Sequence, residues 1–283
     1  ARSLFDAEVT ERARVPEKWI TEGTALAERS VPTRIAFEGH EVSVSYTPLG
    51  VNTPFIEERA RSAEVREAAA ALRKELGDTK LILSVGRTDY TKGGVEQLAS
   101  FERVLEAHPE LHGKMRLMHV SVSANRNMRA YEEIQNEIEQ TAGRINGRFG
   151  TLDWQPIALI SRAIPFADLI AYYQAADVAW ITPLADGMNL VCKEFISSRV
   201  DDDGVLVLSE FAGAAVELGD AVIANPFSHR AMDHAILQAI NMPETERRQR
   251  MAALRTAVKT NDVRSWGPGR LTVANELRVV AAE

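Results

Sequence analysis

Short apolar runs alternate with amphipathic stretches over most of this chain. From Lys80 onward, several runs are almost continuously apolar and rich in β-branched side chains, which is typical of strands buried on both faces of a sheet. They cover residues 81–85, 116–122, 156–160, 178–181, 205–209 and 221–224. Between them, residues 95–107, 168–175 and 189–197 repeat apolar side chains at helical spacing. This alternation predicts an α/β fold built on a doubly wound parallel sheet.

The two ends of the chain have other patterns. Residues 34–36 and 41–46 are typical of strands, with a turn at residues 38–40. A mostly helical stretch, residues 57–76, then leads into the alternating part. Residues 244–283 are predicted to be helical, with a break at residues 266–269, where the sequence is Trp-Gly-Pro-Gly.

Composition and charge narrow the function classes. The formal net charge of -7 argues against a general binder of nucleic acid or of anionic membranes. Cys192 is the single cysteine among 283 residues, so no disulfide forms within the chain and no cysteine cluster holds a metal. We therefore expect a reducing, cytoplasmic setting. No apolar run approaches the roughly 18 residues that span a bilayer. Because the chain begins with Ala-Arg-Ser-Leu rather than Met, we expect it to start within a longer protein.

The stretch from Asp186 to Glu194 is the most informative one. It follows the predicted strand 178–181 and opens the next helix, and open α/β sheets bind their ligands at the carboxyl ends of strands. Gly187 lets the backbone come close to a ligand, and the amides of residues 187–190 at a helix start attract an anion. Glu194 lies farther into the helix and could accept the hydroxyls of a ribose. The alternative is an ordinary turn with Glu194 on a solvated face.

A second loop, residues 85–94, also connects a predicted strand with a helix. It places Arg87 and Lys92 among three glycines. A guanidinium and an ammonium that face one cavity suit a diphosphate leaving group, which gains negative charge as its bond to a sugar breaks. Arginine and lysine in a loop are often simply solvated. The interpretation depends on both loops lying at the same edge of one sheet.

Other motifs are weaker. The small-residue turn 209–215 could receive a nucleotide, but we expect it mainly to allow tight packing, with a supporting role at the site. Gly143, Gly147 and Gly150 lack the spacing of a dinucleotide fingerprint. The acidic run 201–203 is more typical of a solvated loop than of a metal site.

At its two loops the chain resembles the trehalose-phosphate synthase superfamily of retaining glycosyltransferases. The shared motifs are residues 87–93, 143–150, 182–191 and 204–215. Details of residues 91–98, 121–128 and 179–183 resemble the glucosylglycerol-phosphate synthases of that superfamily. Trehalose-phosphate synthases have an arginine for the phosphate of the acceptor where this chain has Asn125, and Arg126 is one place on. This departure favours glycerol 3-phosphate over glucose 6-phosphate as the acceptor.

The resemblance implies a GT-B fold, in which two Rossmann-like domains face each other across a cleft. Residues 1–53 would be the remnant of an N-terminal acceptor-side domain that is otherwise largely missing. Residues 54–262 would form the domain that binds the nucleotide sugar. Residues 263–283 would be a C-terminal helix that packs back toward the N-terminal domain.

Roles for single residues come from the same resemblance. Arg87 and Lys92 would hold the diphosphate as catalytic residues, with Asp186 as a third near the glucose hydroxyls. Asn125 and Arg126 would bind the acceptor. Val120 and Ile164 would flank the base, so the donor-binding residues would be Gly187, Met188, Asn189, Leu190, Glu194, Val120 and Ile164.

The predicted reaction is transfer of glucose from ADP-glucose to glycerol 3-phosphate, with retention at the anomeric carbon and without a metal or other cofactor. Its product would serve compatible-solute synthesis. One alternative is trehalose 6-phosphate synthesis from UDP-glucose and glucose 6-phosphate. A second is a nucleotide-sugar-binding fragment without catalysis. The expected partners are these small molecules, not nucleic acid or a membrane, and a homo-oligomer is compatible with the sequence.

Overall fold

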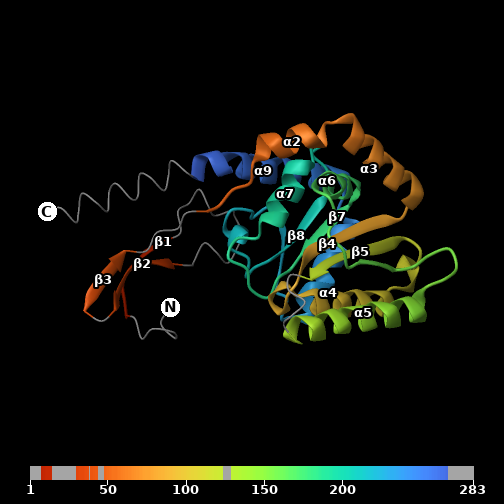
Figure 1. Ribbon diagram of the computed structural model, residues 1–283, viewed down its shortest axis with the longest axis horizontal. Coiled ribbons are helices and arrows are strands. Elements are labelled where there is room, and N and C mark those ends of the chain that lie inside the picture. The colour runs from red at the N-terminus through yellow and green to blue at the C-terminus, as the bar shows by residue number, and fades with distance from the viewer. Residues whose placement is uncertain (1–7, 15–29, 38, 44–47, 124–128, 267–283) are drawn as a thin grey trace.

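A six-stranded parallel sheet forms the centre of the molecule (Figure 1) in the computed structural model, which describes residues 8–14, 30–37, 39–43, 48–123 and 129–266. The strand order is β6-β5-β4-β7-β8-β9, and every neighbouring pair is parallel. The strands are β4 (Lys80–Thr88), β5 (Met115–Ser123), β6 (Ile157–Ile160), β7 (Val178–Ile181), β8 (Val205–Ser209) and β9 (Val222–Ala224). The predicted fold class is confirmed.

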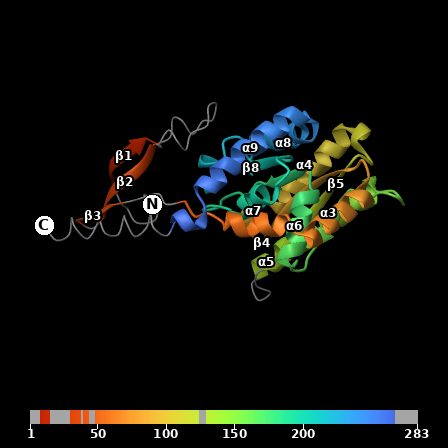
Figure 2. The same cartoon turned by 90° about the horizontal axis from the view of Figure 1, so that it is seen from above.

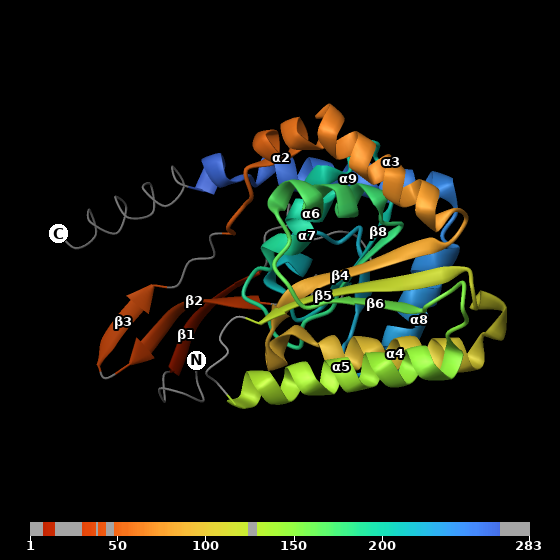
Figure 3. The same ribbon diagram turned by 45° about the vertical axis from the view of Figure 1, so that its right-hand side comes forward.

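Helices cover both faces of this sheet (Figure 3). Successive strand residues enter the two cores in turn, so that Leu81 and Leu83 pack on one side of β4 and Ile82 on the other. This explains why the strands are continuously apolar. One layer holds α2 (Thr53–Ala60), α3 (Ala63–Leu76), α6 (Phe166–Ala175), α7 (Leu190–Ser198) and α9 (Glu244–Thr260). The opposite layer holds α4 (Gly94–Ala107), α5 (Arg129–Phe149) and α8 (His229–Asn241).

The strand order reverses between β4 and β7. After β4 the chain builds β5 and β6 on one side, and it then crosses to β7 on the other side. β4 pairs with β7 at only two positions, Ile82 with Val178 and Leu83 with Ala179, so the pairing stops before the carboxyl ends of both strands. Such a switch point is where open α/β sheets bind their ligands.

A small antiparallel sheet precedes this domain in the chain (Figure 2). It consists of β1 (Glu8–Arg14), β2 (Ser30–Phe37) and β3 (His40–Ser43). The predicted strand 34–36 lies within β2, and Gly39 at the predicted turn has a φ of 79°. The second predicted strand is only partly seen, because residues 44–47 lie outside the described part. β1 was not predicted, and the proposed domain boundaries stay predictions.

Helix boundaries differ from the sequence predictions at several places. The predicted helix 57–76 is two helices, because the Ser62 hydroxyl accepts the Val65 amide and caps a new start. The C-terminal helix ends at Thr260, and the Asp262 carboxylate accepts two amides as the chain turns helical again at residues 263–266. Residues 267–269 of the predicted break lie outside the described part. Helices α5 and α8 were not predicted. Across the described residues, no helix is both long and apolar enough to cross a membrane.

Candidate functional site

The loops after β4 and β7 touch each other at the switch point. The carbonyl oxygen of Thr91 accepts the amides of Leu184, at 2.8 Å, and of Ala185, at 3.4 Å. Gly93 has a φ of 72°, and a Cβ placed there would lie 2.4 Å from the carbonyl oxygen of Thr182. The close approach and the left-handed backbone both require glycine at this position. The two loops therefore form one continuous surface.

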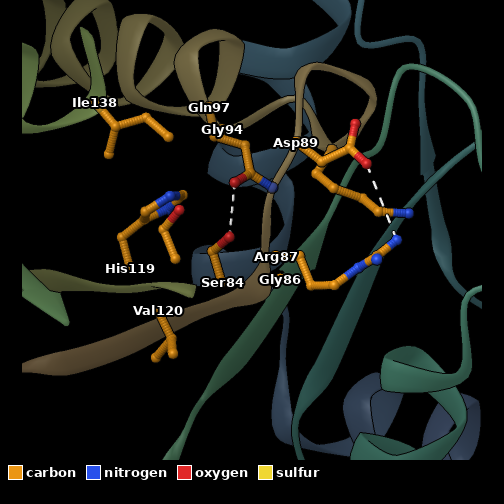
Figure 4. Close-up of a pocket in the computed structure, with 11 residues that line it drawn as sticks. Ser84, Gly86, Arg87, Asp89, Gly94, Gln97, His119, Val120 and Ile138 are labelled. Atoms are coloured by element: carbon orange, nitrogen blue, oxygen red, sulfur yellow. Dashed lines mark hydrogen bonds and ion pairs between the residues drawn. The ribbon is translucent and has the colours of Figure 1, made fainter. Parts of the chain in front are cut away.

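A charged pair joins the side chains of the two loops. Lys92 Nζ lies 2.8 Å from Asp186 Oδ2, and both side chains are mostly buried. Arg87 is 64% exposed, and its guanidinium lies 3.9 Å from the Asp89 carboxylate (Figure 4). Arg87, Lys92 and Asp186 line one open pocket of about 400 Å³, together with Gly86, Met188, Asn189, Leu190 and Val191. The structure thus brings together the two predicted cations and most of residues 186–190, which we call the glycine loop.

The Asp186 carboxylate occupies the anion position at the start of α7. Oδ1 accepts the amides of Met188, at 3.4 Å, and Asn189, at 3.2 Å, while Oδ2 accepts the side-chain amide of Asn189 at 3.1 Å. Burial acts to raise the pKa of Asp186, but the bonds from Lys92 and Asn189 outweigh it and lower the pKa. Two of the amides expected to face an anion, those of Met188 and Asn189, are thus bonded to Asp186, and the donor-binding role of residues 187–190 stays a prediction. An aspartate bonding the next amides is a local feature that the strand–helix pattern does not reveal.

Asn189 completes the helix start. Its backbone has a φ of 65°, and its side-chain oxygen accepts the Cys192 amide at 3.1 Å as the N-cap of α7. Leu190 is the first residue of the helix. Amides in a first helical turn have no acceptor within their helix, and here the Asn189 side chain accepts the amide of Cys192.

Glu194 lies on α7 but does not line this pocket. Its carboxylate accepts the hydroxyl of Tyr173 on α6 at 3.2 Å. Burial raises the pKa of Glu194, and the bond from Tyr173 offsets only part of that rise. The alternative of a fully solvated glutamate is wrong, and the ribose role stays a prediction.

The other predicted donor and acceptor residues have different outcomes. Val120 is buried on β5 and lines a small cavity that opens beside Arg87 and Lys92. Ile164 is partly buried and packs against the hydrophobic core that contains Val120. Asn125 and Arg126, predicted to bind the acceptor, lie outside the described residues.

The small-residue turn after β8 supports the glycine loop. The Gly213 amide donates to the Asp186 carbonyl oxygen at 3.1 Å, and a Cβ at Gly213 would lie 2.0 Å from the Gly187 carbonyl oxygen. Ala212 forms a parallel bridge with Asp186. The turn is therefore packed directly beneath the loop that carries Asp186.

The acidic run 201–203 lies in a loop, as predicted, and the side chains of Asp201 and Asp202 are about half exposed. Each aspartate has an arginine partner: Asp201 pairs with Arg199, Asp202 with Arg255 and Asp203 with Arg247. Within the described ranges, no group of three or more histidine, cysteine or acidic side chains is placed to hold a metal.

Sequence reasoning missed two buried polar residues next to the site. Gln97 is 2% exposed on α4, and Lys193 is fully buried on α7. The available signal was a polar residue at an apolar position of an amphipathic helix. Gln97 lies one turn before Phe101, and Lys193 lies between Cys192 and Phe195 in a mostly apolar stretch.

Comparisons with known proteins agree with this arrangement. The model of glycosyltransferase family 20 matches residues 21–275. A glucosylglycerol-phosphate synthase of Synechocystis sp. is 43% identical over 94% of this chain and 53% of the relative. One of Picosynechococcus sp. is 44% identical over 100% of this chain and 57% of the relative. The chain thus spans about half the length of these curated relatives.

Solved structures show the same fold. The trehalose-6-phosphate enzyme of E. coli bound with UDP-2-fluoro glucose has a TM-score of 0.80 at 34% identity, over 85% of this chain and 53% of that one. The trehalose-phosphate synthase of Burkholderia xenovorans, in complex with glucose-6-phosphate, also has a TM-score of 0.80, at 38% identity over 84% of this chain and 53% of that one. With a matching family model over most of its length and a parallel sheet that carries the paired loops, this chain belongs to glycosyltransferase family 20.

Proposed function

We propose that this chain is the donor-binding half of a glucosyltransferase that makes glucosylglycerol phosphate. The observation that carries the proposal is the meeting of Lys92 with Asp186, beside Arg87, at the carboxyl ends of β4 and β7. The identity to two glucosylglycerol-phosphate synthases over nearly the whole chain supports the acceptor, glycerol 3-phosphate. Because those relatives are about twice as long, we assign donor binding to this chain and transfer to the whole protein.

Donor binding starts with a competition for Lys92. The diphosphate of the nucleotide sugar takes the ammonium that is paired with Asp186, and the exposed Arg87 binds the opposite oxygens. Asp186 is then free to accept glucose hydroxyls. The start of α7 adds the attraction of its amides, a modest contribution of ~0.3–2 kcal/mol. Glu194 accepts the ribose hydroxyls, and Val120 and Ile164 flank the base.

Transfer then breaks the bond from the anomeric carbon to the diphosphate and forms a bond to the glycerol hydroxyl on the same face. The proton of that hydroxyl passes to the leaving phosphate oxygen, so the configuration is retained. Arg87 and Lys92 stabilise the negative charge that grows on the leaving group. In this proposal the cationic side chains and amides do so without a metal or other cofactor, and the donor is ADP-glucose.

Calorimetric titration of the chain with ADP, UDP, ADP-glucose and UDP-glucose tests donor binding. We expect the adenine ligands to bind more tightly and Glu194→Ala to abolish binding. Glu67→Ala, which changes an exposed glutamate on α3, is the matched control and should bind like the wild type. A preference for uracil ligands would favour UDP-glucose as donor and thus trehalose 6-phosphate synthesis. Failure of all four ligands to bind would contradict the donor site.

Glucose transfer by the full-length protein tests the acceptor. Glycerol 3-phosphate and glucose 6-phosphate are offered in competition with a fixed concentration of the preferred donor. We expect the glycerol product to dominate and its anomeric proton signal to match that of the donor. A dominant disaccharide phosphate would replace the proposed reaction with trehalose 6-phosphate synthesis. Donor binding without transfer to either acceptor would leave only a nucleotide-sugar-binding module.

A further inference from the structure

The two loops of the site start where β4 and β7 are no longer paired. The last paired residues are Leu83 and Ala179, whereas β7 stays paired with β8 as far as Ile181. Beyond Leu83, the backbone ladder therefore does not set the distance between β4 and β7. Yet Lys92 follows β4, Asp186 follows β7, and their side chains meet at 2.8 Å. Contacts outside this ladder have to hold the two strand ends: the backbone bonds of Thr91 join the loops, and a buried side chain joins the strand ends themselves.

Gln97 bridges this opening. Its side-chain oxygen accepts the hydroxyl of Ser84 on β4 at 2.7 Å (Figure 4). Its side-chain nitrogen donates to the carbonyl oxygen of Trp180 on β7, at 2.8 Å, and to the hydroxyl of Thr182, at 3.1 Å. The amide thus uses one acceptor and two donors, and Gln97 is buried. A buried amide with three partners in fixed directions is restricted to one orientation.

The same side chain is tied to both charged residues through short stretches of backbone. Gln97 is in the first turn of α4, where its own amide donates to the carbonyl oxygen of Gly93, directly after Lys92. Thr182, its partner on the other side, begins the loop that reaches Asp186. Gly93 and Thr182 also lie in close contact, since a Cβ added at Gly93 would be 2.4 Å from the carbonyl oxygen of Thr182. A shift at Gln97 would therefore change the position of Lys92 relative to Asp186.

We propose that Gln97 is a positioning residue, which sets the separation of the two loops and thereby the affinity of the site for a diphosphate. This inference rests on the proposed function, because it takes the two loops as the diphosphate site. Leucine at this position would leave the Trp180 carbonyl oxygen without the amide, and the loops would keep their backbone bonds at Thr91 but lose the side-chain bridge between β4 and β7. Glutamate would place an oxygen opposite that carbonyl oxygen and repel it.

A purely structural role for Gln97 has to be separated from a positioning role. Ser100 provides the matched control, because it is a buried polar residue on the same helix. Its hydroxyl donates to Asp233 on α8 at 2.6 Å and so links α4 to a helix rather than to a site loop. Ser100→Ala removes a buried hydrogen bond from α4 without touching β4 or β7. Thr182→Val is the milder partner variant, because it keeps the shape and removes one acceptor of Gln97.

The experiment is calorimetric titration of the whole chain with ADP and with AMP, at a temperature where thermal melting shows each variant to be folded. We expect Gln97→Leu to weaken ADP binding by at least about tenfold, the usual effect of an unpaired buried polar group. AMP lacks the second phosphate and therefore depends less on the separation of the two loops. Its affinity should fall less than about twofold, which corresponds to a change in binding free energy well below about 1 kcal/mol. Ser100→Ala should bind both nucleotides like the wild type even if it melts earlier.

Three results would overturn the inference. If Gln97→Leu binds ADP as the wild type does, or loses ADP and AMP equally, Gln97 only stabilises the fold. If Gln97→Leu does not fold, Thr182→Val replaces it, and unchanged ADP affinity in that variant counts equally against positioning. If the wild-type chain binds no nucleoside diphosphate, the donor site itself fails and the inference fails with it. The first two results leave the proposed function intact, so the two failures are distinguishable.

Discussion

Lys193 and Glu217 form a fully buried ion pair, and Lys193 lies on α7, the helix that follows the glycine loop. Lys193 Nζ lies 3.0 Å from one carboxylate oxygen and 3.1 Å from the other, and the side chains are 0% and 1% exposed. The ammonium also donates to the carbonyl oxygen of Leu49 at 2.9 Å, and the side chain of Asn261 donates to Glu217 at 3.1 Å. The pair thus joins α7 to the segment before α2 and to the end of α9.

Replacing Lys193 by methionine should destabilise the chain strongly. Methionine fills similar space, but the Glu217 carboxylate stays buried without its counter-charge. Breaking a buried pair in this way costs about 3–5 kcal/mol. For a chain of this size, each kcal/mol lowers Tm by about 2–4 °C, so the expected fall is about 6–20 °C. The double variant Lys193→Met/Glu217→Leu removes both charges and should regain most of the lost stability.

Denaturant unfolding and thermal melting of Lys193→Met, Glu217→Leu and the double variant form a double-mutant cycle. The cycle measures the coupling free energy between Lys193 and Glu217. Arg103→Met supplies the control, because its pair with Asp233 is about one-third exposed and should cost only about 1 kcal/mol or less. A loss below about 1 kcal/mol for Lys193→Met would refute the reasoning. So would a double variant as unstable as the single ones.

Further predictions concern the site and its surroundings. In the full-length protein, Lys92→Ala should cut turnover by ~10²–10³, the usual effect of removing one electrostatic stabiliser; an unchanged kcat would remove Lys92 from the mechanism. Because burial raises the pKa of Glu194 above its ordinary value of 4.5, ADP affinity should fall as pH drops through that raised pKa, and Glu194→Gln should flatten the profile in calorimetry. Burial lowers the pKa of His119 to about 4 from 6.5, so the unfolded chain binds a proton first as pH falls. Between those values the free energy of unfolding should drop by about 1.4 kcal/mol per pH unit, and urea unfolding of His119→Gln should lack this part of the slope.

The fold could be predicted from the sequence because both faces of its sheet are buried. Strands such as β7 and β8 have to be apolar at every position, and their predicted bounds match the observed ones. The small differences elsewhere arise at strand ends. Helix α5 was not predicted because most of its residues are polar and it contains two glycines. The predicted helix 57–76 was not divided because the N-cap at Ser62, which begins α3, is not visible in the hydrophobic periodicity.

The candidate site was predictable in its parts but not in its contacts. Arg87, Lys92 and the glycine loop were recognised because cations and glycines that follow strands point to an anion, and parallel strands all end at one edge. The engagement of Lys92 and two loop amides by Asp186 depends on side-chain directions within a few ångströms. The bond to Lys92 joins residues 94 positions apart, and the bonds to the loop amides depend on a local side-chain direction that hydrophobic periodicity does not specify.

Local periodicity, composition and loop chemistry by themselves determined the α/β class, the strand positions and the two loops that matter. Only the tertiary structure decided that β4 and β7 are neighbours at the switch point, that Gln97 spans the opening between them, and that Lys193 is neutralised by Glu217. The physical reason is the distance along the chain between the residues that interact. A strand or helix is selected by neighbours along the chain, whereas a buried polar group survives only if the fold brings partners to it from distant segments.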